Sequence, residues 1–313
     1  MKVVTPEFVK TNLYRPPKDS HKGQNGKLTI VGGSKLFHGA SLWALRVASR
    51  IVDMVYYASV PENLELVKDL SKEAYDFIAV PRGKEAEYLA ESDAVLIGPG
   101  LVRGSKEYTG TGESGEETRE LTLSLFQRFP EKKWIIDAGS LQVIEPEELK
   151  KLDQVLITPH RKELERLFGV NLSEDGKPKT ENREQMAENG KRSRSLNQSS
   201  KISRQSSVVS HIAQKYGCTI VLKGKTDIIC ASDGRCLINK AGNEGMTKGG
   251  TGDVLAGLIA ALACKNDLFV AAAVGAYVNG LAGDELYQTV GPYFNASDLC
   301  VQVPKTLFQL TRE

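Results

Sequence analysis

Short runs of apolar, β-branched residues alternate with longer amphipathic stretches along most of the chain. Runs of strand length occur at 27–31, 55–60, 94–97, 134–136 and 155–157, and most are followed directly by Gly, Pro or Asp. Helical patterns lie between them at 39–54, 116–129 and 161–168. This order predicts an α/β fold in which a central, mostly parallel sheet is covered by helices on both faces.

The last third of the chain predicts one more strand, a hairpin and three helices. The run 218–222 has strand character, and 227–231 and 236–239 flank Ser232-Asp233-Gly234, which is typical of a hairpin at a sheet edge. Apolar helical stretches follow near 252–264, 267–287 and 296–311. A chain of 313 residues that is 41% apolar can build one large core, so we expect a single domain over 1–313.

Two stretches interrupt the alternation. Residues 103–117 are rich in Gly, Thr, Ser and Glu and predict a flexible surface loop; because they follow Gly98-Pro99-Gly100, a lid is the alternative. The segment 174–207 predicts a flexible insertion, either disordered or loosely helical, with a basic, serine-rich part from 189 to 207 that contains no acidic residue. Because this part has no aromatic residue to stack on bases, we interpret it as a solvated insertion and expect no nucleic-acid partner.

Charge and cysteine content narrow the class of protein further. The 41 basic and 39 acidic residues give a net charge of only +2, which favours a small-molecule substrate over nucleic acid. No apolar run approaches the ~20 residues that span a bilayer and the start has no signal-peptide core, so we expect a cytoplasmic protein with no membrane partner. The five cysteines are scattered, without a C-x-x-C pair, and predict buried apolar side chains rather than disulfides or a zinc site.

The most informative motif is the glycine-rich stretch 243–257. Gly249, Gly250 and Gly252 lie immediately before an apolar helical run, so unobstructed backbone N–H groups at the positive end of that helix can hold a phosphate. Asp253 follows them, and a carboxylate beside a phosphate site is suited to taking a proton from a substrate hydroxyl that faces the transferring phosphate. The alternative is an ordinary acidic residue in the first turn of a helix.

Other candidate residues come directly after predicted strands, where parallel α/β sheets place their ligands. They are Gly32, Gly33, Gly98, Gly100, Asp137 and His160. Asp137 can reach a metal–phosphate group or cap the next helix. Glu163, one turn beyond His160, can help hold Mg²⁺ or serve as a first-turn helix acid. No G-x-G-x-x-G is present, which argues against a dinucleotide-binding Rossmann site.

A second basic turn lies about 25 residues before the glycine-rich stretch. Lys223 can pair with a phosphate, Gly224 leaves space for a nucleotide, and Thr226 can donate its hydroxyl. Together with the glycine-rich stretch, this turn predicts a nucleotide pocket built from the C-terminal third.

With these motifs in order, the chain resembles the ADP- or ATP-dependent NAD(P)H-hydrate dehydratases, a branch of the ribokinase-like superfamily. The matching motifs cover roughly residues 20 to 290. They are Gly32-Gly33-Ser34, Gly39-Ala40, Gly98-Pro99-Gly100-Leu101, Ile136-Asp137-Ala138, Thr158-Pro159-His160 with Glu163, Leu222-Lys223-Gly224, and Gly242-Asn243-Glu244-Gly245-Met246 with Gly249-Gly250-Thr251-Gly252-Asp253.

The resemblance implies a ribokinase-like fold and an enzyme that uses a nucleotide to restore NADH or NADPH from their hydrated forms. It implies that Asp253 deprotonates the ring hydroxyl while the N–H groups of Gly250 and Gly252 stabilise the phosphoryl group. The hydrate would contact Ala40, Gly100, His160 and Asp253, and the nucleotide would contact Lys223, Gly224, Lys225, Thr226, Asp227 and Gly252. It further implies ADP or ATP as co-substrate with Mg²⁺, an epimerase partner as a separate protein, and a homotetramer.

Three departures from the family pattern and two alternative functions stay open. Val102-Arg103 follows the Gly-Pro-Gly-Leu run where relatives commonly have glycine, Gly139 stands where many have a second aspartate, and the segment 174–207 is longer than usual. One alternative is a small-molecule kinase of the same superfamily, acting on a hydroxymethylpyrimidine or thiazole alcohol. The other is a nucleotide-binding regulator without turnover.

Overall fold

The computed structural model describes residues 1–70, 76–104, 110–172 and 192–312. Ten strands in these ranges form one sheet in the order β1-β10-β9-β8-β7-β6-β5-β2-β3-β4. The strands are β1 (Lys2–Val3), β2 (Lys27–Val31), β3 (Met54–Ser59), β4 (Ile78–Pro81), β5 (Ala94–Ile97), β6 (Lys133–Ile136), β7 (Gln154–Ile157), β8 (Cys218–Leu222), β9 (Asp227–Cys230) and β10 (Cys236–Asn239).

The sheet is parallel from β8 across to β4, and β9 is antiparallel to both of its neighbours. Register places the last residues of neighbouring strands side by side: Val31 pairs with Ile97, Ile97 with Ile136, and Ile136 with Ile157. The segments that follow β2, β5, β6 and β7 therefore leave the sheet at one common edge. The predicted mostly parallel sheet is confirmed, and that edge carries the candidate residues.

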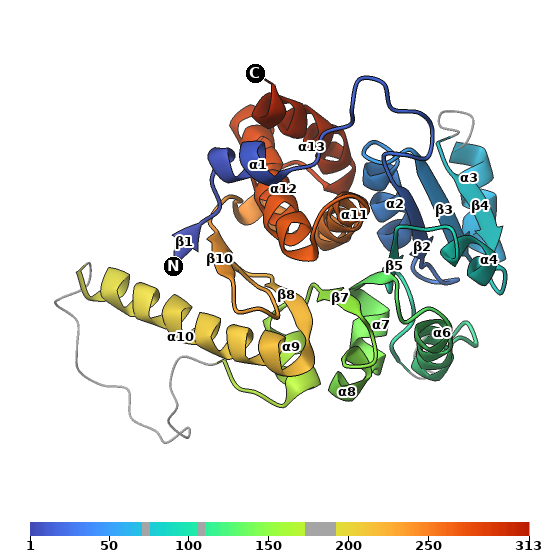
Figure 1. Cartoon of the computed structure of the whole chain (residues 1–313), viewed down its shortest axis with the longest axis horizontal. Helices are drawn as coiled ribbons and strands as arrows, with labels where there is room; N and C mark the ends of the chain where they lie inside the picture. Colours follow the sequence, from blue (N-terminus) through green and yellow to red (C-terminus); the bar gives the residue numbers. More distant parts are fainter. Residues whose placement is uncertain (71–75, 105–109, 173–191, 313) are drawn as a thin grey trace.

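Helices cover both faces, as predicted, and each face has its own apolar core (Figure 1). One core lies under α1 (Pro6–Asn12), α2 (Gly39–Ala48), α3 (Pro61–Leu70), α11 (Thr251–Ala263), α12 (Leu268–Val290) and α13 (Ala296–Thr311). The other lies under α4 (Glu85–Leu89), α6 (Gly115–Arg128), α7 (Ala138–Val143), α8 (Pro146–Leu149), α9 (Arg161–Phe168) and α10 (Arg192–Tyr216). Because strand side chains alternate between faces, Ile30 packs into the first core and Val31 into the second.

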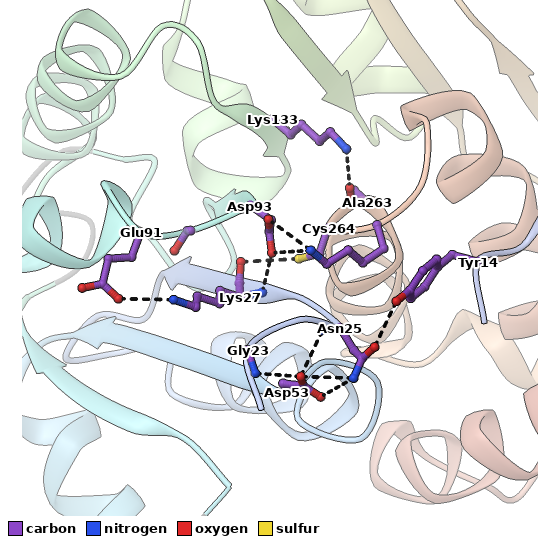
Figure 2. A network of polar contacts seen from close by, with 12 residues as sticks. Tyr14, Gly23, Asn25, Lys27, Asp53, Glu91, Asp93, Lys133, Ala263 and Cys264 are labelled. Atoms are coloured by element: carbon purple, nitrogen blue, oxygen red, sulfur yellow. Dashed lines mark hydrogen bonds and ion pairs between the residues drawn. The ribbon is translucent and has the colours of Figure 1, made fainter. Parts of the chain in front are cut away.

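The central helix of the first face is α11, which is apolar around its whole circumference and almost completely buried. It crosses α2 so closely that a Cβ on Gly257 would lie 2.6 Å from the Cα of Ala44. At its C-terminal end, Lys133 Nζ donates to the carbonyl of Ala263 at 2.9 Å (Figure 2). Lys265 Nζ lies 3.4 Å from an Asp93 oxygen. These contacts fix the end of α11 at the start of the central strands, so that its beginning lies at the opposite edge, near the candidate site.

Several details differ from the sequence-based expectations. The short strands β1 and β4 were not predicted. The loop expected at 103–117 lies partly outside the described residues, and its end belongs to α6. Of the insertion expected at 174–207, residues 174–191 lie outside the described residues. Residues 192–207 form the first part of α10, which projects from the sheet (Figure 1), and this agrees with the helical alternative for that part. No helix within the described ranges is long and apolar enough to cross a membrane.

The expectation that the cysteines form no disulfide is wrong for one pair. Cys230 on β9 and Cys236 on β10 are bonded to each other. They are directly paired across the hairpin, which brings their Cα atoms to 4.3 Å. The hairpin register, which the spacing of six residues does not reveal, creates this proximity. Cys218, Cys264 and Cys300 are free and buried, as expected.

Candidate active site

The site is centred on the first turn of α11. Gly250 precedes this helix with a left-handed backbone, φ +95°, which a glycine adopts without strain. No side chain caps the helix, and no acceptor in the described part of the chain is paired with the N–H of Gly250 or Gly252. The positive end of α11 therefore presents free donors to an anion, as the glycine-rich motif predicts.

Asp253 lies in this first turn and is partly buried. Burial and the negative charge of Asp137 raise the pKa of Asp253 to about 7, against the opposing effect of Lys223. The charge of Glu163 acts in the same direction as Asp137 but more weakly. A carboxylate whose pKa lies near neutrality can accept a proton from a substrate and release it again.

Lys223 and Asp137 form an ion pair beside this turn. The Nζ of Lys223 lies 3.0 Å from Asp137 Oδ1, which also accepts a hydrogen bond of 2.8 Å from the Thr158 hydroxyl. Burial acts to lower the pKa of Lys223, but the charges of Asp137 and Glu163 outweigh it and raise that pKa. A Cβ on Gly252 would lie 3.6 Å from the Nζ, so the ammonium group reaches the beginning of α11.

Asp137 does not cap the helix that follows it, which was the alternative to a role in binding a metal–phosphate group. It precedes α7, yet its side chain makes no capping hydrogen bond there. Thr158 and Lys223 both contact its Oδ1, and no partner of Oδ2 is found among the described residues. One carboxylate oxygen is thus left for a ligand.

His160 and Glu163 cap α9 reciprocally. The Glu163 N–H donates to His160 Nδ1 at 3.2 Å, and the His160 N–H donates to Glu163 Oε2 at 2.8 Å. Because Nδ1 accepts, a neutral His160 carries its proton on Nε2. Gln142 Nε2 donates to the other Glu163 oxygen at 2.7 Å. The first-turn role proposed as the alternative for Glu163 is therefore present, and the half-exposed imidazole is held at the sheet edge.

The turn after β8 is shaped by Asp227. Its carboxylate accepts from the Gly224 N–H at 3.0 Å and from Asn239 Nδ2 at 3.0 Å, and burial raises its pKa. Asp227 is thereby engaged within the turn, whereas Gly224 and Lys225 are exposed. In the loop 243–247, a hydrogen bond from Tyr287, more than the charge of Lys225, lowers the pKa of Glu244.

The loops that follow β2 and β5 meet at the same edge. The N–H of Gly33 donates to the Pro99 carbonyl at 2.8 Å. Gly100 has φ +74°, and a Cβ there would lie 2.6 Å from the Phe37 carbonyl oxygen. This close approach explains the glycine at position 100. Ala40 lies in the first turn of α2, whose start has no side-chain cap.

Two positioning contacts near the site were missed from the sequence. Asp284 on α12 accepts from the Gly242 N–H at 3.0 Å and from Asn243 Nδ2 at 2.9 Å, which fixes the beginning of the glycine-rich stretch. Trp43 on α2 packs against Gly250, where a Cβ would lie 2.5 Å from the indole ring, and donates to Ser297 at 3.2 Å. Neither residue belongs to a motif; only the contact of elements distant in sequence reveals them.

Comparison with known proteins gives a consistent family. A family model described as NAD(P)H-hydrate dehydratase matches residues 28–305. The chain is 31% identical to an ADP-dependent (S)-NAD(P)H-hydrate dehydratase of Cenarchaeum symbiosum, covering 93% of this chain and 91% of that protein. It is 34% identical to a bifunctional NAD(P)H-hydrate repair enzyme of Methanocaldococcus jannaschii, covering 94% of this chain but 50% of that protein. The chain thus spans about half the length of several curated relatives that it matches.

Solved structures agree with this result. An ADP/ATP-dependent NAD(P)H-hydrate dehydratase of Bacillus subtilis, co-crystallised with ATP and Mg²⁺, superposes with a TM-score of 0.73 at 25% identity and covers 99% of this chain and 98% of that one. A ribokinase-like superfamily protein of Enterococcus faecalis, at 20% identity and a TM-score of 0.74, shares the fold over 100% of this chain and 97% of that one. The predicted ribokinase-like fold is confirmed.

Proposed function

Because the chain belongs to the NAD(P)H-hydrate dehydratase family, we propose that it removes water from hydrated NADH or NADPH at the expense of a nucleotide. The observation that carries the proposal is the position of Asp253. Its carboxylate, with a pKa of about 7, lies in the same helical turn as free N–H donors and next to the Lys223 ammonium. A proton acceptor and a phosphate site thus meet at one point.

The reaction follows from this arrangement. Asp253 takes the proton of the ring hydroxyl, and the hydroxyl oxygen forms a bond to the terminal phosphorus of the donor while the bond to the leaving nucleotide breaks. The N–H groups of Gly250 and Gly252 and the Lys223 ammonium stabilise the negative charge on the transferring group. The phosphorylated oxygen then leaves as phosphate and a ring carbon loses a proton, which restores the double bond.

We assign the two ligands to opposite sides of Asp253. Gly252 and the turn of Lys223, Gly224, Lys225, Thr226 and Asp227 would hold the nucleotide. In this turn Asp227 acts by shaping the backbone, because Gly224 and Asn239 engage its carboxylate. Ala40, Gly100 and His160 would face the hydrate; the loops after β2 and β5 bring the first two to the same sheet edge as His160.

We propose Mg²⁺ as a companion of the nucleotide. No cluster of three or more His, Cys, Asp or Glu side chains suited to a metal is present in the described ranges, but Mg²⁺ is commonly bound by one or two carboxylates together with substrate phosphates. Asp137 Oδ2 fits this role, with Glu163 nearby as a second carboxylate. The ion would neutralise charge on the donor phosphates. ADP or ATP would serve as donor. The Cenarchaeum symbiosum relative is named as ADP-dependent, and the Bacillus subtilis relative is named as ADP/ATP-dependent.

The proposal is tested by incubating the protein with NADH hydrate, Mg²⁺, and ADP or ATP. Recovery of absorbance at the reduced-nicotinamide band, absent with Asp253→Asn, is the expected result. A phosphorylated hydroxymethylpyrimidine or thiazole alcohol without such recovery would identify a kinase instead, and the absence of any turnover would leave a nucleotide-binding regulator.

We further propose a homotetramer and a separate epimerase partner. A monomeric mass by light scattering would contradict the homotetramer. The epimerase partner would be contradicted if adding an epimerase left the yield of NADH from a mixture of hydrate epimers unchanged.

A further inference from the structure

A cavity of about 570 Å³ lies beside the active site, on the face of the sheet opposite α11. It is bounded by segments that follow β5, β6 and β7, whereas the proposed nucleotide turn follows β8. Its volume is within the usual range for small-molecule sites. The basic and apolar groups in its wall include Arg103, Arg119, Arg166, Leu141, Val143 and Leu167.

The cavity adjoins the active site at two points, Glu163 and Arg103. Glu163, which caps α9 with His160, is part of its wall. Arg103 is also part of the wall and comes three residues after Gly100, the residue assigned to the hydrate. Three residues span at most about 11 Å, so one extended ligand can contact Gly100 and the cavity together.

The chemistry of the wall suits one half of a dinucleotide. Guanidinium groups bind phosphate oxygens in a fork, apolar side chains accommodate a base, and carboxylates accept hydrogen bonds from ribose hydroxyls. Glu116 and Glu145 in the wall supply such carboxylates. Arg166 is already bound to the Gln142 carbonyl, whereas no hydrogen bond or ion pair joins the side chain of Arg119 to another described residue. Arg119 is thus available to a ligand.

We propose that this cavity binds the adenosine-phosphate half of the hydrated dinucleotide, with Arg119 holding a phosphate; the assignment rests on the proposed function. The hydrated ring lies at Asp253, and the chain of ribose and pyrophosphate passes Gly100 toward Arg103. Val102-Arg103, where the sequence departs from the family pattern, then supplies a second guanidinium group. The donor nucleotide remains on the β8 side, so the two adenine groups do not compete.

The test compares a dinucleotide with a mononucleotide in Arg119→Gln. We expect the KM for hydrated NADH to rise about tenfold, because one charge-assisted hydrogen bond is lost, and kcat to stay unchanged. The KM for hydrated reduced nicotinamide mononucleotide, which lacks the adenylate half, should stay the same. Arg128→Gln is the matched control, because Arg128 lies on the same helix with its guanidinium 5.5 Å from the Phe129 ring and is not part of the cavity wall.

An unchanged KM for the dinucleotide, or an equal rise for both substrates, would overturn the assignment. Calorimetric binding of NAD⁺ and of nicotinamide mononucleotide keeps the test independent of turnover. Arg119→Gln should weaken NAD⁺ about tenfold and leave the mononucleotide unaffected. If the wild-type protein turns over neither hydrate but this binding difference is present, the proposed function fails and the cavity assignment stands. Equal NAD⁺ binding by both proteins would refute the cavity assignment alone.

Discussion

Lys223 and Asp137 follow β8 and β6, the two strands that flank β7, and they form an ion pair of 3.0 Å next to the first turn of α11. The pair sets the electrostatic balance at Asp253, since Asp137 raises the pKa of that carboxyl and Lys223 lowers it. Neither residue can be altered without changing the proton affinity of the proposed base. This coupling leads to the first prediction.

Lys223→Gln should raise the pKa of Asp253 above about 7, because the positive charge that lowers it is lost. The acid limb of the pH–rate profile should move to higher pH, and the KM for the nucleotide should rise about tenfold or more. Steady-state kinetics across pH measures both effects. Lys225→Gln is the control: Lys225 is exposed in the same turn, so its loss should leave the acid limb in place. An acid limb at the same pH in both variants would contradict the coupling between Lys223 and Asp253.

The pH dependence of the wild-type protein gives the second prediction. A general base works only when deprotonated, so kcat/KM should fall below about pH 7, the pKa of Asp253, by about tenfold for each pH unit. Above that pH the rate should level off until another group titrates. A profile that is flat between about pH 5 and 8 would show that a different group accepts the proton.

Asp253→Asn should abolish turnover and stabilise the fold at alkaline pH. The pKa of Asp253 is about 7 in the folded protein against an ordinary value of 3.8, so the folded state holds this proton more tightly than the unfolded state. The free energy of unfolding therefore falls as pH rises from about 4 to about 7, by up to about 4 kcal/mol. Asparagine carries no charge and avoids this loss.

Urea unfolding of both proteins at about pH 4 and about pH 8 measures the effect. The variant should be the more stable protein at the higher pH and nearly equal at the lower one. A difference that is the same at both values would mean that packing, rather than the charge of Asp253, accounts for it.

Much of the site was predictable because it uses local backbone rules. Glycines before an apolar helix predict a phosphate site, and Gly250 does precede α11 with a positive φ. Residues that end parallel strands predict a shared edge, and Asp137, His160 and Lys223 do meet there. In each case one short segment contains the signal.

The unpredicted features depend on contacts between distant segments. Asp284 holds Gly242 from 42 residues away, and the Cys230–Cys236 bond depends on hairpin register. The pKa of Asp253 likewise results from burial and from charges on other segments of the sheet edge. Hydrophobic periodicity along the chain contains no information on such pairings, so the elements could be predicted but their mutual positions could not.

The last prediction concerns the glycines themselves. Gly250→Ala should reduce both stability and turnover, because an alanine at φ +95° is strained and its Cβ would lie 2.5 Å from the Trp43 ring and 2.8 Å from the Ala296 Cβ. We expect a loss of at least about 2 kcal/mol in the free energy of unfolding. The Trp43 ring must also move, which misaligns the N–H donors and raises the KM for the nucleotide.

Gly249→Ala is the matched control, since a Cβ there meets nothing within 4 Å. It should change stability by less than about 0.5 kcal/mol. Chemical unfolding and nucleotide titration of both variants separate the two glycines; similar losses in both would mean that the loop needs flexibility at each glycine, rather than the one left-handed position that Trp43 packs against.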